Sequence, residues 1–171
     1  MSSAEEIFEV LDTQGQVIGL ATRSAVHSDP SLIHRVVHVM VFNTQGSLLL
    51  QKRSRDKDIA PGRWDTSVGG HVNLGEDVYD AAVREMQEEL GIKTSDLQFL
   101  YRYLFRNNRE SELVTTFRCV CDEDVHFNRE EIDEVKFWHL SSIKQQIGQG
   151  IFSSHFEQEF SHYLRQIKKQ E

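Results

Sequence analysis

Three glutamates in the stretch GHVNLGEDVYDAAVREMQEELGI, residues 70–92, have the spacing of a metal site. Glu85, Glu88 and Glu89 are three and four residues apart, so on a helix their carboxylates converge on one side. Carboxylates held together repel one another unless a cation lies between them. A hard divalent ion with oxygen ligands, Mg²⁺ or Mn²⁺, suits such a cluster. The spacing therefore predicts a metal site, and the alternative is a solvated acidic helix face.

The same stretch carries the local signals of a helix that positions these carboxylates. Asp77 is expected in its first turn, where an acidic side chain suits the positive end of the helix dipole. Gly91 lies where a helix end favours a left-handed residue. An apolar stripe at helical spacing is formed by Val78, Ala82, Val83, Met86 and Leu90. The glutamates therefore flank a helix that packs on a core.

This stretch matches the Nudix box position by position. The pattern is Gly, five residues, Glu, seven residues, Arg-Glu, an aliphatic residue, any residue, Glu-Glu, any residue, Gly and an aliphatic residue. It is filled by Gly70, Glu76, Arg84, Glu85, Met86, Glu88, Glu89, Gly91 and Ile92. The chain thus resembles the Nudix hydrolases, which cleave a nucleoside diphosphate linked to another group. The resemblance implies an α/β/α sandwich with a mixed sheet.

By this resemblance the box residues take part in metal-dependent attack of water on a diphosphate. Glu85, Glu88 and Glu89 are the expected Mg²⁺ ligands, and the box does not identify which of them, if any, is the base. Arg84 is expected to orient a neighbouring carboxylate. Glu76 is expected to help from the loop, directly or through water.

A wider part of the chain resembles the type 1 isopentenyl-diphosphate isomerases, a branch of the Nudix superfamily. The resemblance is carried by AVHSDPSLIHRVVHVMVFNTQGSLLLQKRS and PGRWDTSVGGH. The metal-site positions of that enzyme are filled here by His27, His34, His71, Glu110 and Glu112. They predict a second metal site for Mn²⁺, Zn²⁺ or Mg²⁺. The alternative is that these side chains merely hydrogen-bond one another.

The resemblance to the isomerase breaks at its catalytic cysteine, because that position holds Gly69. Glycine has no group that can exchange a proton with a carbon substrate. The box glutamates, several of which the isomerase lacks, are all present. Hydrolysis of a small-molecule diphosphate is therefore the favoured function. Isomerase or other prenyl diphosphate chemistry is the first alternative, and a catalytically silent binding module is the second.

Three basic residues before the box, Lys52, Arg53 and Lys57, are candidate phosphate ligands. Arg53 and Lys57 match positions that contact diphosphate in the isomerase. The alternative is an ordinary solvated basic loop. The identity of the substrate and the oligomeric state are not set by the sequence.

The element pattern predicts one domain over residues 1–171, with strands and helices in an order typical of a sheet between helix layers. A hairpin is expected at 7–22, a core at about 34–140 and C-terminal helices at 141–168. Within the core, strands are expected at 35–43, 48–52, 64–68, 97–105, 113–121 and 135–139.

Composition limits the classes of partner. A net charge of −8 disfavours a sequence-independent grip on nucleic acid, which needs a basic face. No signal peptide or membrane-spanning apolar run is recognisable, so a cytoplasmic protein is expected. Cys119 and Cys121 are two apart on an expected strand and are expected to remain free thiols.

Overall fold

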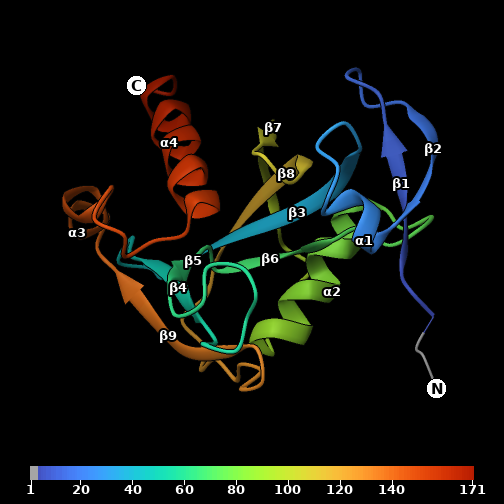
Figure 1. The fold of residues 1–171 in the computed structure, drawn as a ribbon. Helices are drawn as coiled ribbons and strands as arrows, with labels where there is room; N and C mark the ends of the chain where they lie inside the picture. The colour runs from blue at the N-terminus through green and yellow to red at the C-terminus, as the bar shows by residue number, and fades with distance from the viewer. Residues whose placement is uncertain (1–3) are drawn as a thin grey trace.

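Strand β3 (Ile33–Phe42) runs through the middle of the fold and is buried along almost its whole length (Figure 1). It pairs in parallel with β8 (Ser111–Val120). β7 (Gln98–Arg106) then pairs with β8 in the antiparallel sense. The sheet is therefore mixed, as the sequence predicts. The computed structural model describes residues 4–171, and within them the sheet has nine strands.

The other edge of β3 contacts three strands in succession. The first is β1 (Ile7–Leu11), which forms the expected hairpin with β2 (Val17–Thr22). β6 (Val68–His71) follows, and β4 (Leu48–Arg53) pairs at the far end. β4 in turn pairs with β5 (Trp64–Asp65) and β9 (Ile132–Trp138).

The prediction of one strand at 64–68 is wrong, because the chain changes partners there. β5 pairs with β4, whereas β6 pairs with β3. The Ser67 hydroxyl accepts a hydrogen bond from the Val41 N–H at 2.9 Å and donates one to the Leu49 carbonyl oxygen at 2.5 Å. This side chain links β3 to β4 where the two strands diverge, and it replaces the ladder bonds that a continuous strand would make.

Helices cover both faces of the sheet (Figure 1). α2 (Val78–Leu90) lies on one face, and α3 (Leu140–Gln146) and α4 (Ser154–Lys168) lie on the other; α1 (Arg23–Val26) is a single turn before β3. Side chains alternate along β3. One set packs under α2 with Val37, Val39, Ala82, Met86 and Leu90, and the other packs under α4 with Met40, Phe42, Phe156 and Phe160. The expected α/β/α sandwich is confirmed.

Both ends of α2 are capped by the residues that the sequence singles out. Asp77 is the N-cap rather than a first-turn residue, and its carboxylate accepts a hydrogen bond from the Tyr79 N–H at 2.8 Å. Gly91 ends the helix with φ +66°. A side chain there would put Cβ 2.9 Å from the His126 carbonyl oxygen, so the position needs glycine. Among the described helices none is long and apolar enough to cross a membrane.

Candidate active site

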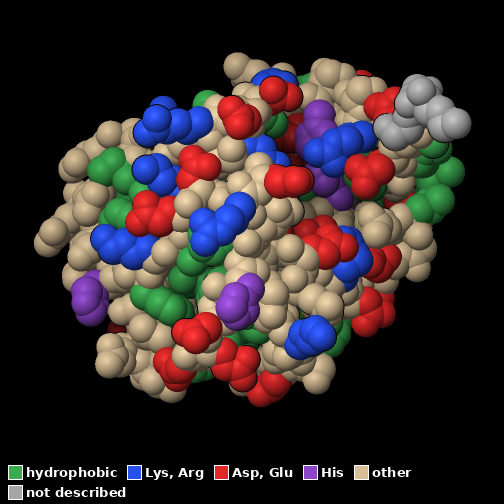
Figure 2. All heavy atoms as spheres, turned by 90° about the horizontal axis from the view of Figure 1, so that it is seen from below, with side chains coloured by type: hydrophobic (Ala, Val, Ile, Leu, Met, Phe, Trp, Pro, Cys, Tyr) green, Lys and Arg blue, Asp and Glu red, His purple; other side chains and the backbone are tan. Residues whose placement is uncertain are grey.

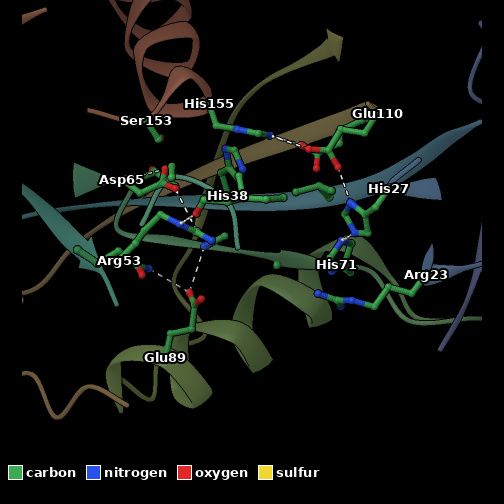
Figure 3. Close-up of a pocket in the computed structure, with 18 residues that line it drawn as sticks. Arg23, His27, His38, Arg53, Asp65, His71, Glu89, Glu110, Ser153 and His155 are labelled. Atoms are coloured by element: carbon green, nitrogen blue, oxygen red, sulfur yellow. Dashed lines mark hydrogen bonds and ion pairs between the residues drawn. The ribbon is translucent and has the colours of Figure 1, made fainter. Parts of the chain in front are cut away.

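A cavity of about 170 Å³ lies between β6, the start of α4 and the adjoining ends of β3 and β8 (Figure 3). Glu89 reaches it from α2, His71 from β6 and His155 from α4, while Arg53 lies on the opposite side from His27. Figure 2 shows histidine side chains in a hollow between acidic and basic ones. The cavity is therefore polar and bears both signs of charge.

On the box side, Gly70 allows Glu85 to lie directly against the strand. A Cβ at Gly70 would be 2.2 Å from Cδ of Glu85, which no side chain permits. Arg84 bonds Glu76 through two nitrogens at 2.8 and 2.9 Å and bonds Glu85 at 2.8 Å. It also donates to the His71 carbonyl oxygen at 3.0 Å. Arg84 thus has the contacts of a residue that orients carboxylates, and its hydrogen bonds lower the pKa of Glu76.

Glu89 is held by neutral donors. Its carboxylate accepts from the Gly69 N–H at 3.1 Å and from the Gln51 amide at 3.5 Å. Burial raises the pKa of both Glu85 and Glu89, and the charge of Glu85 raises that of Glu89 further. Two partly buried carboxylates that disfavour each other's charge suit a cation. Glu88 lies apart from them: its side chain is 58% exposed and its carboxylate is 3.2 Å from Arg84.

The structure brings together the five residues of the predicted second site. Two overlapping triplets each have ligand atoms within 4.8 Å of one another: His27, His34 and His71 in one, and His34, Glu110 and Glu112 in the other. His27 Nδ1 lies 2.5 Å from Glu110 Oε2, and His27 Nε2 lies 3.0 Å from His71 Nε2.

These contacts leave part of the cluster unsatisfied. Both ring nitrogens of His34 and Oε2 of Glu112 are buried and lack a hydrogen-bond partner among residues 4–171. Each such group costs about 1–3 kcal/mol when left unpaired. Burial lowers the pKa of His34 to about 4 and that of His71 to about 3, so both rings are neutral, the form in which imidazole binds a metal. The donor set therefore fits an ion.

Two histidines of this cavity carry no sequence signal of function. His155, in a helix predicted from its apolar stripe, lies 3.3 Å from Glu110 and 3.7 Å from Glu112 and stacks on Phe105. Burial alone would raise the pKa of Glu110, but hydrogen bonds with His155 and His27 lower it. His38, on β3, lines the cavity beside Gly69.

Of the three predicted phosphate ligands, Arg53 is the one that lines the cavity. Its guanidinium donates to the Ile59 carbonyl oxygen at 2.8 Å and to Asp65 at 3.4 Å. Lys57 pairs instead with Glu131 at 3.3 Å. Lys52 lies 6.0 Å from the centre of the Trp64 ring.

A family model described as the NUDIX domain matches residues 32–158. The chain belongs to the Nudix family. It is 33% identical over 136 residues to an uncharacterised Nudix hydrolase, PA4841 of Pseudomonas aeruginosa, and the match covers 80% of each protein. The chain is therefore an enzyme, a Nudix pyrophosphohydrolase, and Nudix hydrolases generally need divalent metal ions.

The resemblance to the isomerase branch is also found. The chain is 40% identical over 89 residues to the isopentenyl-diphosphate Delta-isomerase of Streptomyces avermitilis. That match covers 52% of this chain and 45% of the isomerase. Among solved structures, DR0079 from Deinococcus radiodurans aligns with a TM-score of 0.79 at 23% identity, over 91% of this chain and 98% of that one. This last similarity supports the fold alone.

Proposed function

We propose that this Nudix enzyme hydrolyses the diphosphate of a nucleoside diphosphate derivative or a similar small molecule, with Mg²⁺ or Mn²⁺. The observation that carries the proposal is the carboxylate pair of Glu85 and Glu89, in which Arg84 pairs with Glu85 while Glu89 has only neutral donors. Gly70 leaves room for Glu85 against β6, and the Gly69 N–H of the same strand bonds Glu89. A polyanionic substrate needs its charge neutralised before water can attack phosphorus.

The box residues have different proposed roles in binding the ion. Glu85 and Glu89 are the inner carboxylates for the ion, and Glu88 adds a third from the exposed side of α2. Arg84 holds Glu76 and Glu85 in place. A bound ion would neutralise the diphosphate and lower the pKa of a water molecule.

The basic residues bind the substrate from the other side of the cavity. Arg53 is available to phosphate oxygens, since its partner Asp65 lies at 3.4 Å, a weak contact for a guanidinium. Lys52 and Lys57 lie outside the cavity lining and are proposed to act at its rim, once Lys57 leaves Glu131.

We also propose that the histidine-rich cluster holds a second ion, Mn²⁺, Zn²⁺ or Mg²⁺. Support comes from the two buried nitrogens of His34 and the Oε2 atom of Glu112, which have no hydrogen-bond partner among residues 4–171. His27, His71 and Glu110 complete the donor set. A donor set of three imidazoles and two carboxylates does not select among these ions.

Isomerase chemistry is the alternative, and the 40% identity to an isomerase is what favours it. Gly69 opposes it, because the position of the catalytic cysteine has no side chain. Both cysteines of the chain, Cys119 on β8 and Cys121 just after it, are free thiols and do not line the cavity. Hydrolysis remains the better supported proposal.

A panel of diphosphates tests the proposal. ADP-ribose, NADH, a dinucleoside tetraphosphate, a nucleoside diphosphate sugar and isopentenyl diphosphate are each incubated with the protein, with and without Mg²⁺, and phosphate products are measured. We expect turnover of at least one compound, and only with metal. Glu89→Gln keeps the shape but removes a charge, so turnover should fall by about 10²-fold.

The matched control is Glu123→Gln, the same change at an exposed loop position. It should leave the rate unchanged. A Glu89→Gln protein with the wild-type rate would remove Glu89 from the mechanism, and hydrolysis that proceeds equally in EDTA would refute the metal requirement.

A further inference from the structure

His38 is an imidazole fixed in place by a buried carboxylate. It lies in the middle of β3 and is 5% exposed. Its Nδ1–H donates to Oε2 of Glu159 at 2.7 Å. Glu159, on α4, is fully buried and also accepts from the hydroxyls of Tyr103 at 2.7 Å, Thr116 at 3.2 Å and Tyr101. Because Glu159 is held by donors from three strands, the His38 ring has one orientation.

The second nitrogen of this ring faces the cavity. Nε2 of His38 makes no hydrogen bond to any residue in 4–171, and His38 is part of the cavity lining (Figure 3). A Cβ at Gly69 would lie 3.2 Å from its Cδ2 and 3.5 Å from its Nε2. The ring thus occupies the space that a side chain at position 69 would need. The N–H of the same glycine is held by the box carboxylate Glu89 at 3.1 Å.

The surroundings of His38 favour its charged form. The ionisable groups nearby come from four elements: Arg53, Asp65, Glu112, His155 and Glu159. Burial alone would lower the pKa of His38, but the hydrogen bond to Glu159 and the charges of Glu159, Glu112 and Asp65 outweigh it and raise the pKa. The two tyrosines on Glu159 stay neutral, since burial raises their pKa values. In its charged form the ring presents the Nε2–H to the cavity.

We propose that His38 is a catalytic acid of this pocket: its Nε2–H contacts the diphosphate and gives its proton to the phosphate that leaves. Glu159 is the positioning residue. The oxygen of water forms a bond to one phosphorus, and the bond from that phosphorus to the bridging oxygen breaks. The electron pair stays on the bridging oxygen, which takes the proton from Nε2. The proton lost by the attacking water returns through solvent to His38.

This inference rests on the proposed hydrolysis. The alternative explanation is that the His38–Glu159 pair only stabilises the fold. His38→Gln keeps a donor near the cavity but cannot transfer a proton. We expect kcat to fall by about 10²-fold, with KM changed less than threefold. The control is His126→Gln, the same change at an exposed loop position.

The pH dependence separates the two accounts. A general acid must be protonated, so kcat of the wild type should fall as pH rises through the raised pKa of His38. In the His38→Gln variant, kcat should no longer fall over this pH range. Glu159→Gln should move it to lower pH, because the charge that raises the pKa of His38 is gone. A His38→Gln protein within threefold of the wild-type kcat, or with the same fall at high pH, would overturn the inference.

A binding measurement tests the contact without turnover. Wild-type protein labelled with ¹⁵N in its histidine rings is titrated with methylenediphosphonate, a diphosphate that cannot be hydrolysed, in the presence of Mg²⁺. We expect the Nε2 resonance of His38 to shift and its pKa to rise, while His126 is unchanged. An unresponsive His38 at millimolar diphosphonate would also overturn the inference. Failure of the proposed function is a different result: no compound of the panel is hydrolysed.

Discussion

Gly70→Ala tests whether the fit between β6 and the box carboxylates matters for catalysis. The added Cβ would lie 2.2 Å from Cδ, 2.4 Å from Oε1 and 2.6 Å from Cγ of Glu85. The closest of these is 1.2 Å shorter than 3.4 Å, the lower end of ordinary van der Waals contact. The Glu85 side chain must therefore rotate out of its present position and lose its hydrogen bond to Arg84.

Gly70→Ala should lower stability slightly and kcat strongly. The clash is with the end of a flexible side chain, so the free energy of unfolding should fall by only about 1–3 kcal/mol. For a chain of this size that lowers Tm by about 2–12 °C. Displacement of a metal ligand should cost about 10²-fold in kcat, or about 2.7 kcal/mol of transition-state stabilisation. Loss of activity should therefore greatly exceed loss of folded protein at 25 °C.

The assay compares phosphate release and thermal unfolding of Gly70→Ala with those of Gly19→Ala. A Cβ at Gly19, on β2, meets nothing within 4 Å, and neither glycine has a positive φ. The control should keep wild-type activity. The reasoning fails if Gly70→Ala is folded and retains kcat within threefold of the wild type. It also fails if its activity declines only in proportion to the fraction unfolded.

Two further predictions concern the cavity. The wild-type protein should form no dimethylallyl diphosphate from isopentenyl diphosphate above a no-enzyme control, because Gly69 supplies no acid at the cysteine position; clear product formation would contradict this. The His34→Ala, Glu112→Gln double variant should bind one ion fewer per chain than the wild type, as measured by elemental analysis at neutral pH. Equal metal content in the two proteins would mean that the second site does not exist.

The sequence predicts those parts of the fold whose cause is local. The 7–22 hairpin and the stop of α2 at Gly91 follow from turn and capping residues, and the structure has both. Predicted strands agree with β3 and β4 to within about two residues, since long apolar runs identify them. The division of this segment into β5 and β6 at Ser67 depends on which strands lie beside it. No local sequence pattern indicates those neighbours.

Some site residues can be recognised from local spacing, and others cannot. Glu85 and Glu89 are recognisable because helix geometry fixes their spacing. The five residues of the histidine-rich cluster come from the residue after α1, from β3, from β6, from the β7–β8 turn and from the start of β8. Only a resemblance to a family with that arrangement indicates them. Glu88 shows the limit of spacing arguments: it has the right separation, but its side chain extends to solvent and to Arg84.

His38 and Glu159 are 121 residues apart, and neither fills a specified position of the Nudix box or a metal-site position of the isomerase. In the sequence, His38 interrupts an apolar run on β3, and Glu159 interrupts an apolar helix stripe on α4. Each of these is a buried polar residue that local reasoning treats as an irregularity. Since a buried charge needs a partner, each of these two residues predicts a second buried polar residue elsewhere in the chain. The partner itself is identified only when the topology places α4 over β3.

Strand β6 lies between the two groups of candidate ligands. Successive residues of a strand face opposite sides. Gly70 faces α2, where Glu85 fills the space of its missing side chain, whereas Gly69 and His71 face the other side, toward His38 and the histidine-rich cluster. The Gly69 N–H, which lies in the plane of the sheet, bonds Glu89. Three consecutive residues therefore contact three different groups. One short strand therefore lies against both groups of candidate ligands.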